Sequence, residues 1–493
     1  MATGVNKGDV IELQRPIRGE ASPIEEDVKL DGEYRETGDH DGADMDRLGR
    51  KQELKRNFHS LSTVGLTCII MGTWLGMIAS STFALINGGR AGTIYMYIIC
   101  WIFQLPVIAS IAEMSSMAPT GAGQYHWVSE FAPPSKQKCL SYVSGWLSAL
   151  GWQAMIASTA YTSGQFILIL ASMEGQFTPQ NWQGAILTMA FAFFAVALNI
   201  FGAKHLPLFE CVILFFNIIG FFAVCIPLWI GADAAAHMSE EVKDASLSVP
   251  RVMMFTLMLN GVLGFIATVT FVYSIQSIED QILGSTYAFP YIGIFADATN
   301  SYAGAIGMTI PWAVLSVAAT INSVAAGSRQ AWAFARDEGF PFSHWLQQIT
   351  VIQGTPLPVN AMLATLSVTV VLACIIMGSS EAFNSIAGLL TGAISFSYAL
   401  SIGCVLWRRL YGAPLAPARF SLGRWGVPIN VVGCLFQILT TVICFFPVEN
   451  AVTPASTNWG STMFGGVAIL ATIYYFFHGH KVYEGPVVHV KQI

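Results

Sequence analysis

The sequence predicts an all-α polytopic membrane protein, and three observations carry that prediction. Asp, Glu, Lys and Arg make up only 11% of the 493 residues, whereas soluble proteins carry about 25%. These charges are concentrated at the start, because residues 1–59 hold 10 of the 24 Lys and Arg and 14 of the 30 Asp and Glu. The rest of the chain contains nearly uncharged apolar stretches of about 20 residues, the length that a helix needs to cross hydrocarbon. Only helices suit such stretches, because lipid offers no partner to an unpaired backbone amide.

Eleven apolar stretches follow a polar beginning. Residues 1–57 show no sustained apolar period and are predicted to be a disordered cytosolic tail, residues 58–478 the transmembrane domain, and residues 479–493 a second cytosolic tail. The spans are predicted at about 60–86, 93–117 (uncharged to 112), 141–171, 182–203, 207–230, 252–276, 301–328, 359–377, 382–406, 428–447 and 460–477. When the second stretch is counted only to residue 112, Glu210 is the single charged residue inside the set.

The distribution of basic residues predicts the orientation and reveals an inconsistency. If the first tail is cytosolic, the external loops hold only Arg90 and the other basic residues lie inside, as the positive-inside rule requires. That holds only if 237–251 (HMSEEVKDASLSVPR) is cytosolic, yet the span 207–230 should end outside. One crossing is therefore missing, shortened or re-entrant near residue 230; the alternative is that the charge bias fails here.

The first span contains Gly65, Gly72 and Gly76, with Thr73 and Trp74 at its middle. Glycine in a membrane helix either permits close packing or marks a break, and unwound backbone at mid-membrane is how many transporters present peptide groups to a solute. Both readings remain open from this span alone.

The second span ends in AEMSSMAPTGAGQYHW, which contains Glu113, Gln124 and Tyr125. This segment is either an interfacial loop with aromatic anchors or a gate beside the cytosolic exit, and a carboxylate near membrane depth favours a functional role.

Two further segments stand out. In GADAAAH, Asp233 is either a loop aspartate or a group that orients a cationic solute or a coupling proton. In SRQAWAFARDEGFP, the charged residues from Arg329 to Glu338 predict a solvated cytosolic helix with internal charge pairs, ended by the Gly-Phe-Pro sequence.

Several function classes are excluded by what the sequence lacks. The net charge of −6 gives no basic footprint for nucleic acid. The histidines and cysteines show no metal-binding spacing, and there is no phosphate-binding loop, nucleophile elbow or dinucleotide fingerprint. We therefore expect no enzyme, no cofactor and no metal site.

Three of these segments, AEMSSMAPTGAGQYHW, GADAAAHMSEEVKDASLSVP and SRQAWAFARDEGFP, together resemble the amino acid–polyamine–organocation superfamily, in particular its fungal amino acid/choline permeases of the 4-aminobutyrate type. The resemblance spans about residues 55–480. It implies a leucine-transporter-like fold with twelve helices, in which helices one and six are unwound and hold the solute. Here helix six is truncated, so about eleven full spans are expected, because roughly 40 residues are absent before Gly231.

The resemblance also implies a site, with the lipid bilayer and a small amine or amino-acid solute as partners. It places solute binding at Gly72, Thr73, Trp74, Trp152, Gln153, Gly231, Ala232, Asp233 and Asn322, and gating at Glu113, Gln124 and Tyr125. Half-helix amides would hold a carboxylate and free carbonyls an ammonium, whereas a quaternary amine would need an aromatic box, with Trp74, Trp152 and Trp229 as candidates. Protons are the implied coupling ion.

The expected function is therefore a secondary active permease for amino acids, 4-aminobutyrate or choline, working by alternating access. The alternatives are a transport-inactive truncated permease and a nutrient-sensing, permease-like receptor. The expected location is the plasma membrane, with the vacuolar membrane as the alternative.

Overall fold

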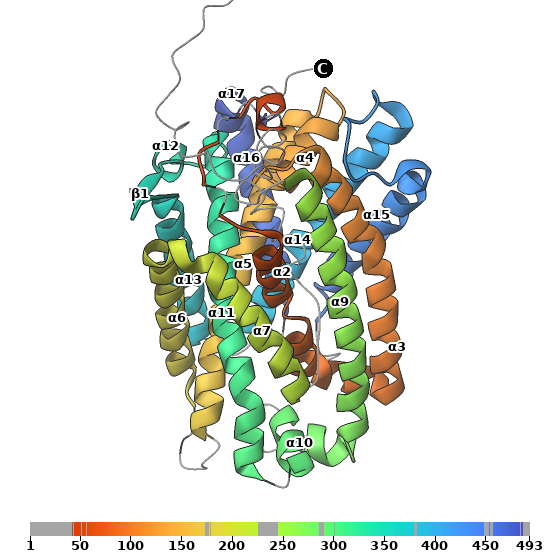
Figure 1. The fold of residues 1–493 in the computed structure, drawn as a ribbon, viewed down its shortest axis with the longest axis vertical. Coiled ribbons are helices and arrows are strands. Elements are labelled where there is room, and N and C mark those ends of the chain that lie inside the picture. Colours follow the sequence, from red (N-terminus) through yellow and green to blue (C-terminus); the bar gives the residue numbers. More distant parts are fainter. Residues whose placement is uncertain are drawn as a thin grey trace, which may run out of the picture.

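The computed structural model describes residues 44–50, 52–55, 57–172, 179–224, 245–284, 290–299, 301–378, 382–447 and 457–483, with residues 42, 177, 453, 485 and 486. Long helices run along one axis and make up nearly all of this part of the chain (Figure 1). Ten helical segments of the described residues are long and apolar enough to cross a membrane. The all-α membrane fold predicted from the sequence is thereby confirmed.

The long helices follow the predicted apolar stretches. They are α2 (Ser60–Met71), α3 (Thr73–Met117), α5 (Gln137–Ser172), α6 (Asn181–Phe201), α7 (Leu206–Val224), α9 (Ala245–Ser274), α11 (Tyr302–Arg336), α13 (Val359–Gly378), α14 (Ala382–Tyr411), α15 (Gly426–Ile443) and α16 (Gly460–Tyr474). α3 contains the second part of the first predicted crossing and all of the second crossing, because its backbone leaves the helical conformation between them at Gly89 (φ 60°, ψ −165°). Glycine tolerates this conformation, which other residues rarely adopt.

Shorter elements cap the two ends of the bundle. They are α4 (Gln124–Phe131), α10 (Pro290–Thr299), α12 (Ser343–Leu346), α17 (His480–Val482), the short helices Ala203–His205, Glu279–Leu283, Gly423–Trp425 and Tyr475–Gly479, and the strands β1 (Thr350–Ile352) and β2 (Thr355–Leu357). The two strands form an antiparallel hairpin with Val351 opposite Pro356. We call the end that carries α4 and α12 the inner end and the end that carries α10 the outer end (Figure 1).

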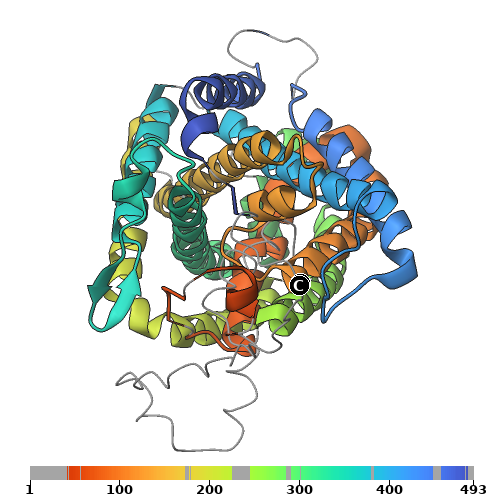
Figure 2. The same ribbon diagram turned by 90° about the horizontal axis from the view of Figure 1, so that it is seen from above.

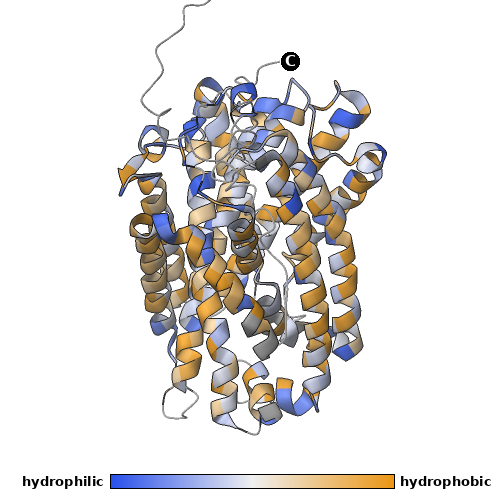
Figure 3. Cartoon of the chain, viewed as in Figure 1, coloured by the Kyte–Doolittle hydropathy of each residue, from blue (hydrophilic) through white to orange (hydrophobic). Residues whose placement is uncertain are grey.

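Apolar residues predominate in the middle of the bundle, and hydrophilic residues are concentrated toward its ends (Figure 3). Along the bundle axis, the helices form a closed, roughly circular arrangement (Figure 2). α11 is central, because it packs against α2, α5, α6, α7 and α13. α3 packs against α9 and α15, and α14 packs against α5, α15 and α16.

The crossing predicted to be missing, shortened or re-entrant near residue 230 lies outside the described residues. α9 starts at the inner end, where Ser246 accepts a hydrogen bond from Ser116 through its carbonyl oxygen, and it runs to the outer end (Figure 1). The number of crossings between α7 and α9 stays a prediction.

Two expectations about the inner end are corrected. The polar tail is expected to be disordered to residue 57, but Leu48 and Leu54 are each no more than 2% exposed and pack into the core. Likewise, Arg329 and Asp337 were expected on a solvated helix, yet both are buried. Local composition missed these cases because tertiary contacts from distant segments cover the side chains.

Candidate functional site

A backbone break divides the first membrane helix. α2 ends at Met71, Gly72 adopts the left-handed conformation (φ 46°, ψ 30°), and α3 starts at Thr73. Glycine suits this position because it has no Cβ to clash in that conformation. The first turn of α3 presents peptide N–H groups that lack acceptors within the helix, at the positive end of a helix dipole. The break predicted between Met71 and Trp74 is confirmed.

The two side chains after Gly72 differ in how they are held. Thr73 is 3% exposed, and its hydroxyl has no hydrogen-bond partner among the described residues. Trp74 donates its indole N–H to Asn217 of α7 over 2.6 Å and meets Trp312 of α11 edge-on, with 6.1 Å between ring centroids. Trp74 is therefore fixed by two helices, while Thr73 keeps a buried polar atom without a partner.

Further aromatic rings surround Trp312 between the break and the outer end. Tyr291 and Phe295 of α10 lie 4.9 and 5.7 Å from the Trp312 ring, and Phe166 of α5 lies 5.9 Å away. We call Trp74, Trp312, Tyr291, Phe295 and Phe166 the outer aromatic cluster. Sequence reasoning found only Trp74, because the other rings come from three segments whose contact no local pattern records.

α5 and α11, which pack against each other, both carry buried hydroxyl side chains. Ser163 lies within hydrogen-bond distance (3.2 Å) of Thr320. Ser158 and Ser323 are buried, and their hydroxyls have no hydrogen-bond partner among the described residues. These polar atoms lie on two of the helices from which the sequence predicted solute contacts, but at other positions.

The tryptophan pair proposed as an aromatic box is not brought together. Trp152 packs against Gly327 of α11 and belongs to a different core cluster from Trp74. Gln153 donates to Thr365 of α13 over 3.2 Å, so its amide is directed to that helix. Trp229 lies outside the described residues, and so do Gly231, Ala232 and Asp233.

Asn322 contacts a buried acid. Its amide donates to Oε2 of Glu210 on α7 over 2.9 Å, and both side chains are almost completely buried. Gly65 of α2 packs on the same place, because a Cβ added there would lie 2.5 Å from the Glu210 carbonyl oxygen. Three helices, α2, α7 and α11, therefore meet at Glu210. The sequence showed Glu210 as an unusual charge but did not reveal its partners.

A polar network lies at the inner end. Arg50 forms an ion pair with one carboxylate oxygen of Asp337, at the end of α11, and Tyr125 of α4 donates its hydroxyl to the other over 2.9 Å. Burial, and then the Asp337 carboxylate, raise the pKa of Tyr125 well above its ordinary value, so the phenol stays a donor. Gln124 accepts from Ser148 of α5 over 3.2 Å. Two of the three residues predicted to gate, Gln124 and Tyr125, thus take part in polar contacts at the inner end, and their gating role stays a prediction.

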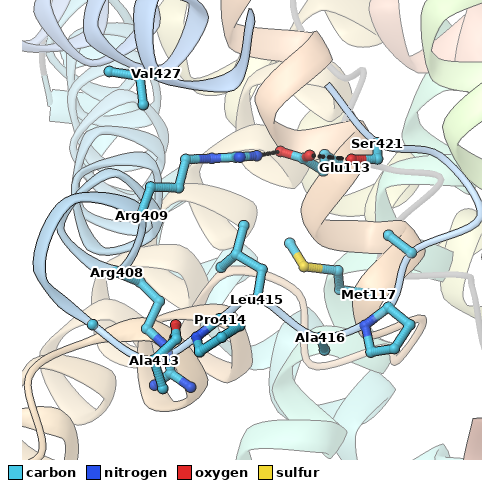
Figure 4. Close-up of a pocket in the computed structure, with 13 residues that line it drawn as sticks. Glu113, Met117, Arg408, Arg409, Ala413, Pro414, Leu415, Ala416, Ser421 and Val427 are labelled. Atoms are coloured by element: carbon cyan, nitrogen blue, oxygen red, sulfur yellow. Dashed lines mark hydrogen bonds and ion pairs between the residues drawn. The ribbon is translucent and has the colours of Figure 1, made fainter. Parts of the chain in front are cut away.

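The third, Glu113, lies in a different network. It pairs with Arg409 of α14 and accepts hydrogen bonds from the Ser421 hydroxyl and, over 2.8 Å, from the Leu422 backbone N–H. These contacts border a pocket of about 600 Å³ between α3, α14 and the loop of residues 412–421 (Figure 4). The pocket shares no residue with the Gly72 break, so it is distinct from the predicted solute site.

Comparison with known proteins identifies the chain. The sequence profile of the amino acid permease family matches residues 61–232 and 229–469. The chain belongs to the amino acid permease family. It is therefore a multi-pass membrane protein of a transporter family, not an enzyme.

Relatives of this permease carry several names. It is 24% identical to the choline transporter of Saccharomyces cerevisiae, covering 96% of this chain and 90% of that protein. It is also 26% identical to the GABA-specific permease of the same yeast, over 90% of this chain and 85% of that protein. It is 26% identical to amino-acid permease 2 of Neurospora crassa, over 90% of this chain and 89% of that protein. A manganese transporter from Eremococcus coleocola shares the fold at 11% identity, with a TM-score of 0.51 over 89% of this chain and 98% of that one.

The alignments also indicate where this permease is short. The alignment with the choline transporter is 517 positions long and covers 96% of this chain. Because 96% of 493 residues is about 473 residues, about 44 alignment positions are gaps in this chain. The family profile matches in two parts that meet at residues 229–232. Both observations agree with the expected absence of roughly 40 residues before Gly231.

Proposed function

We propose that this permease carries an amino acid, with 4-aminobutyrate in that class, across the plasma membrane by alternating access. The observation that carries the proposal is the break at Gly72, where α3 begins. The first N–H groups of a helix have no acceptor within the helix itself, and the Thr73 hydroxyl beside them has no hydrogen-bond partner among the described residues. A solute carboxylate suits such donors, because the helix dipole favours negative charge at this end. Two of the fungal relatives, amino-acid permease 2 and the GABA-specific permease, are named for the same solute class.

Choline is the second candidate, and the described residues favour it less. Choline has no carboxylate to accept from the α3 amides, and its quaternary ammonium is bound best over aromatic faces. Trp74 and Trp152 belong to separate core clusters, and Trp74 is already packed edge-on against Trp312. We therefore assign the carboxylate-bearing solute to the site first.

Alternating access assigns the inner network a role. In the proposed cycle, the contacts among Arg50, Asp337 and Tyr125 hold the inner end closed. Opening that end would require separating these groups, and Gly72 provides a flexible point at which α2 can move relative to α3. Protons are the proposed coupling ion.

Transport by the purified chain in liposomes tests this function. We expect saturable uptake of labelled 4-aminobutyrate or a neutral amino acid, inhibited by unlabelled amino acids more strongly than by choline. T73V should weaken solute binding, because it removes the hydroxyl while keeping the shape. T472V is the matched control, since Thr472 of α16 only bonds to the Ala468 carbonyl oxygen of its own helix.

Three outcomes would contradict the proposal. Uptake of choline that amino acids do not inhibit would reverse the choice of solute. Solute binding without flux, detected as a thermal shift, would favour the receptor. The absence of both binding and flux in correctly folded protein would favour a transport-inactive truncated permease, in line with the residues missing before Gly231.

A further inference from the structure

Glu210 is an acid buried inside the membrane domain. It lies on α7, is 0% exposed, and receives a hydrogen bond from Asn322 at Oε2, while Oε1 has no hydrogen-bond partner among the described residues. No ion pair of the described residues includes it. Charging such a group in place is costly unless water or a cation reaches it, and buried acids in membrane helices mark ion and proton pathways.

The position of Glu210 links it to the moving part of the proposed cycle. α2 covers it, with Gly65 so close that a Cβ would overlap the Glu210 carbonyl oxygen. α2 is the helix half on the inner side of the Gly72 break, and the segment before it is tied to α11 through Arg50 and Asp337. Any opening of the inner end that moves α2 would therefore uncover Glu210 to water from that side.

We propose that Glu210 is the group that binds and releases the coupling proton in this permease, an inference that rests on the proposed transport function. In the closed arrangement Oε1 carries the proton taken from the outer side. When α2 moves, water from the inner side reaches the carboxyl group and accepts the proton. One proton then crosses with each solute, and Asn322 holds the carboxylate in place during the exchange.

The surrounding charged groups do not replace Glu210 in this role. Among the described residues, the titratable and charged side chains on the elements packed against it are Cys211 of α7, Lys204 and His205 just before α7, His59 and Cys68 at α2, and Tyr302, Arg329 and Arg336 of α11. Tyr302 is exposed at the opposite end of α11 from Arg336. Lys204 and His205 are exposed at the inner end. The Cys68 thiol faces Asn260 of α9, and Arg329 donates to the Ala325 carbonyl oxygen of its own helix. Glu210 is thus the buried acid at the meeting point of α2, α7 and α11.

The test separates exchange from accumulation in E210Q proteoliposomes. Glutamine keeps the shape and can still accept from Asn322, but it cannot release a proton. We expect E210Q to exchange labelled for unlabelled solute as the wild type does, yet to lose both the accumulation driven by a pH gradient and the solute-induced proton uptake. E279Q is the matched control, because Glu279 is an exposed acid near the outer end, and it should behave as the wild type.

Two results would overturn the inference. One is pH-gradient-driven accumulation by E210Q at the wild-type level, which would leave Glu210 a packing residue. The other is solute transport by the wild-type protein that does not depend on a pH gradient. This measurement uses the wild-type protein alone, so it does not require a variant that folds. If E210Q does not reach the membrane, E210D, which keeps the acid, should retain accumulation. A wild type without solute exchange contradicts the transport function instead, so the two failures are distinguishable.

Discussion

Arg50 and Asp337 form an ion pair across 287 positions of sequence, and both side chains are nearly buried, with 9% and 2% exposed. Asp337 follows α11, whereas Arg50 lies ahead of the first membrane helix. The Asp337 carboxylate also accepts from Tyr125, so three separate segments meet at one group. This contact ties the N-terminal segment to the helix that occupies the centre of the bundle.

Breaking this pair from one side should destabilise the inner closure. R50A leaves Asp337 buried without its cation, which costs about 3–5 kcal/mol for a buried pair, so we expect a lower unfolding temperature and faster labelling of inner-end cysteines. R50Q/D337N, which removes both charges, should recover part of the loss. R424A is the control, because Arg424 is exposed. Equal unfolding temperatures for R50A and R424A would contradict the prediction.

The Tyr125 phenol predicts a loss of stability at high pH. Its pKa is raised well above 10.0 by burial and by Asp337. The unfolded phenol ionises near pH 10, whereas the folded one stays protonated. Stability from this group is therefore complete below about pH 10 and falls as the pH rises toward the folded pKa. Y125F should flatten the fall in unfolding temperature above pH 10. Y411F, at an exposed tyrosine, should keep the wild-type slope, and an identical slope in both variants would refute the assignment.

The close approach of α2 and α7 depends on Gly65. G65A places a Cβ 2.5 Å from the Glu210 carbonyl oxygen, so the helices must separate, at a cost of about 1–3 kcal/mol. We expect a lower unfolding temperature together with altered transport, because the cover over Glu210 is disturbed. G307A is the matched control, since nothing lies within 4 Å of the added carbon. A G65A protein as stable as G307A would show that the contact is looser than described.

The Gly72 break can be separated from general backbone strain. G72A and G89A both place a side chain at positive φ, 46° and 60°, where an L-residue is disfavoured by about 1–2 kcal/mol. Neither added carbon meets a close neighbour. We expect both variants to lose stability but only G72A to lose solute uptake, measured per folded molecule. Comparable uptake losses in the two variants would remove the special role of the break.

Much of the fold was readable from the sequence, because insertion into lipid depends on local apolarity. The membrane spans follow from composition along short stretches. The break in helix one came from the family resemblance, because the glycines of the first span alone left close packing equally open, and the sidedness of the basic loops stays a prediction. The shortage of residues near 230 was visible in the same way, since a missing crossing reverses the charge pattern of every later loop.

The site depended on contacts that no short stretch contains. The pairing of Glu210 with Asn322, the ion pair of Arg50 with Asp337 and the outer aromatic cluster around Trp312 each join segments far apart in the chain. Trp74 and Trp152, two of the three candidates for an aromatic box, lie in different core clusters, because tryptophans on different helices need not turn toward one another. Hydrophobicity decides which residues enter the membrane, and only the packing of the helices decides which polar groups meet there.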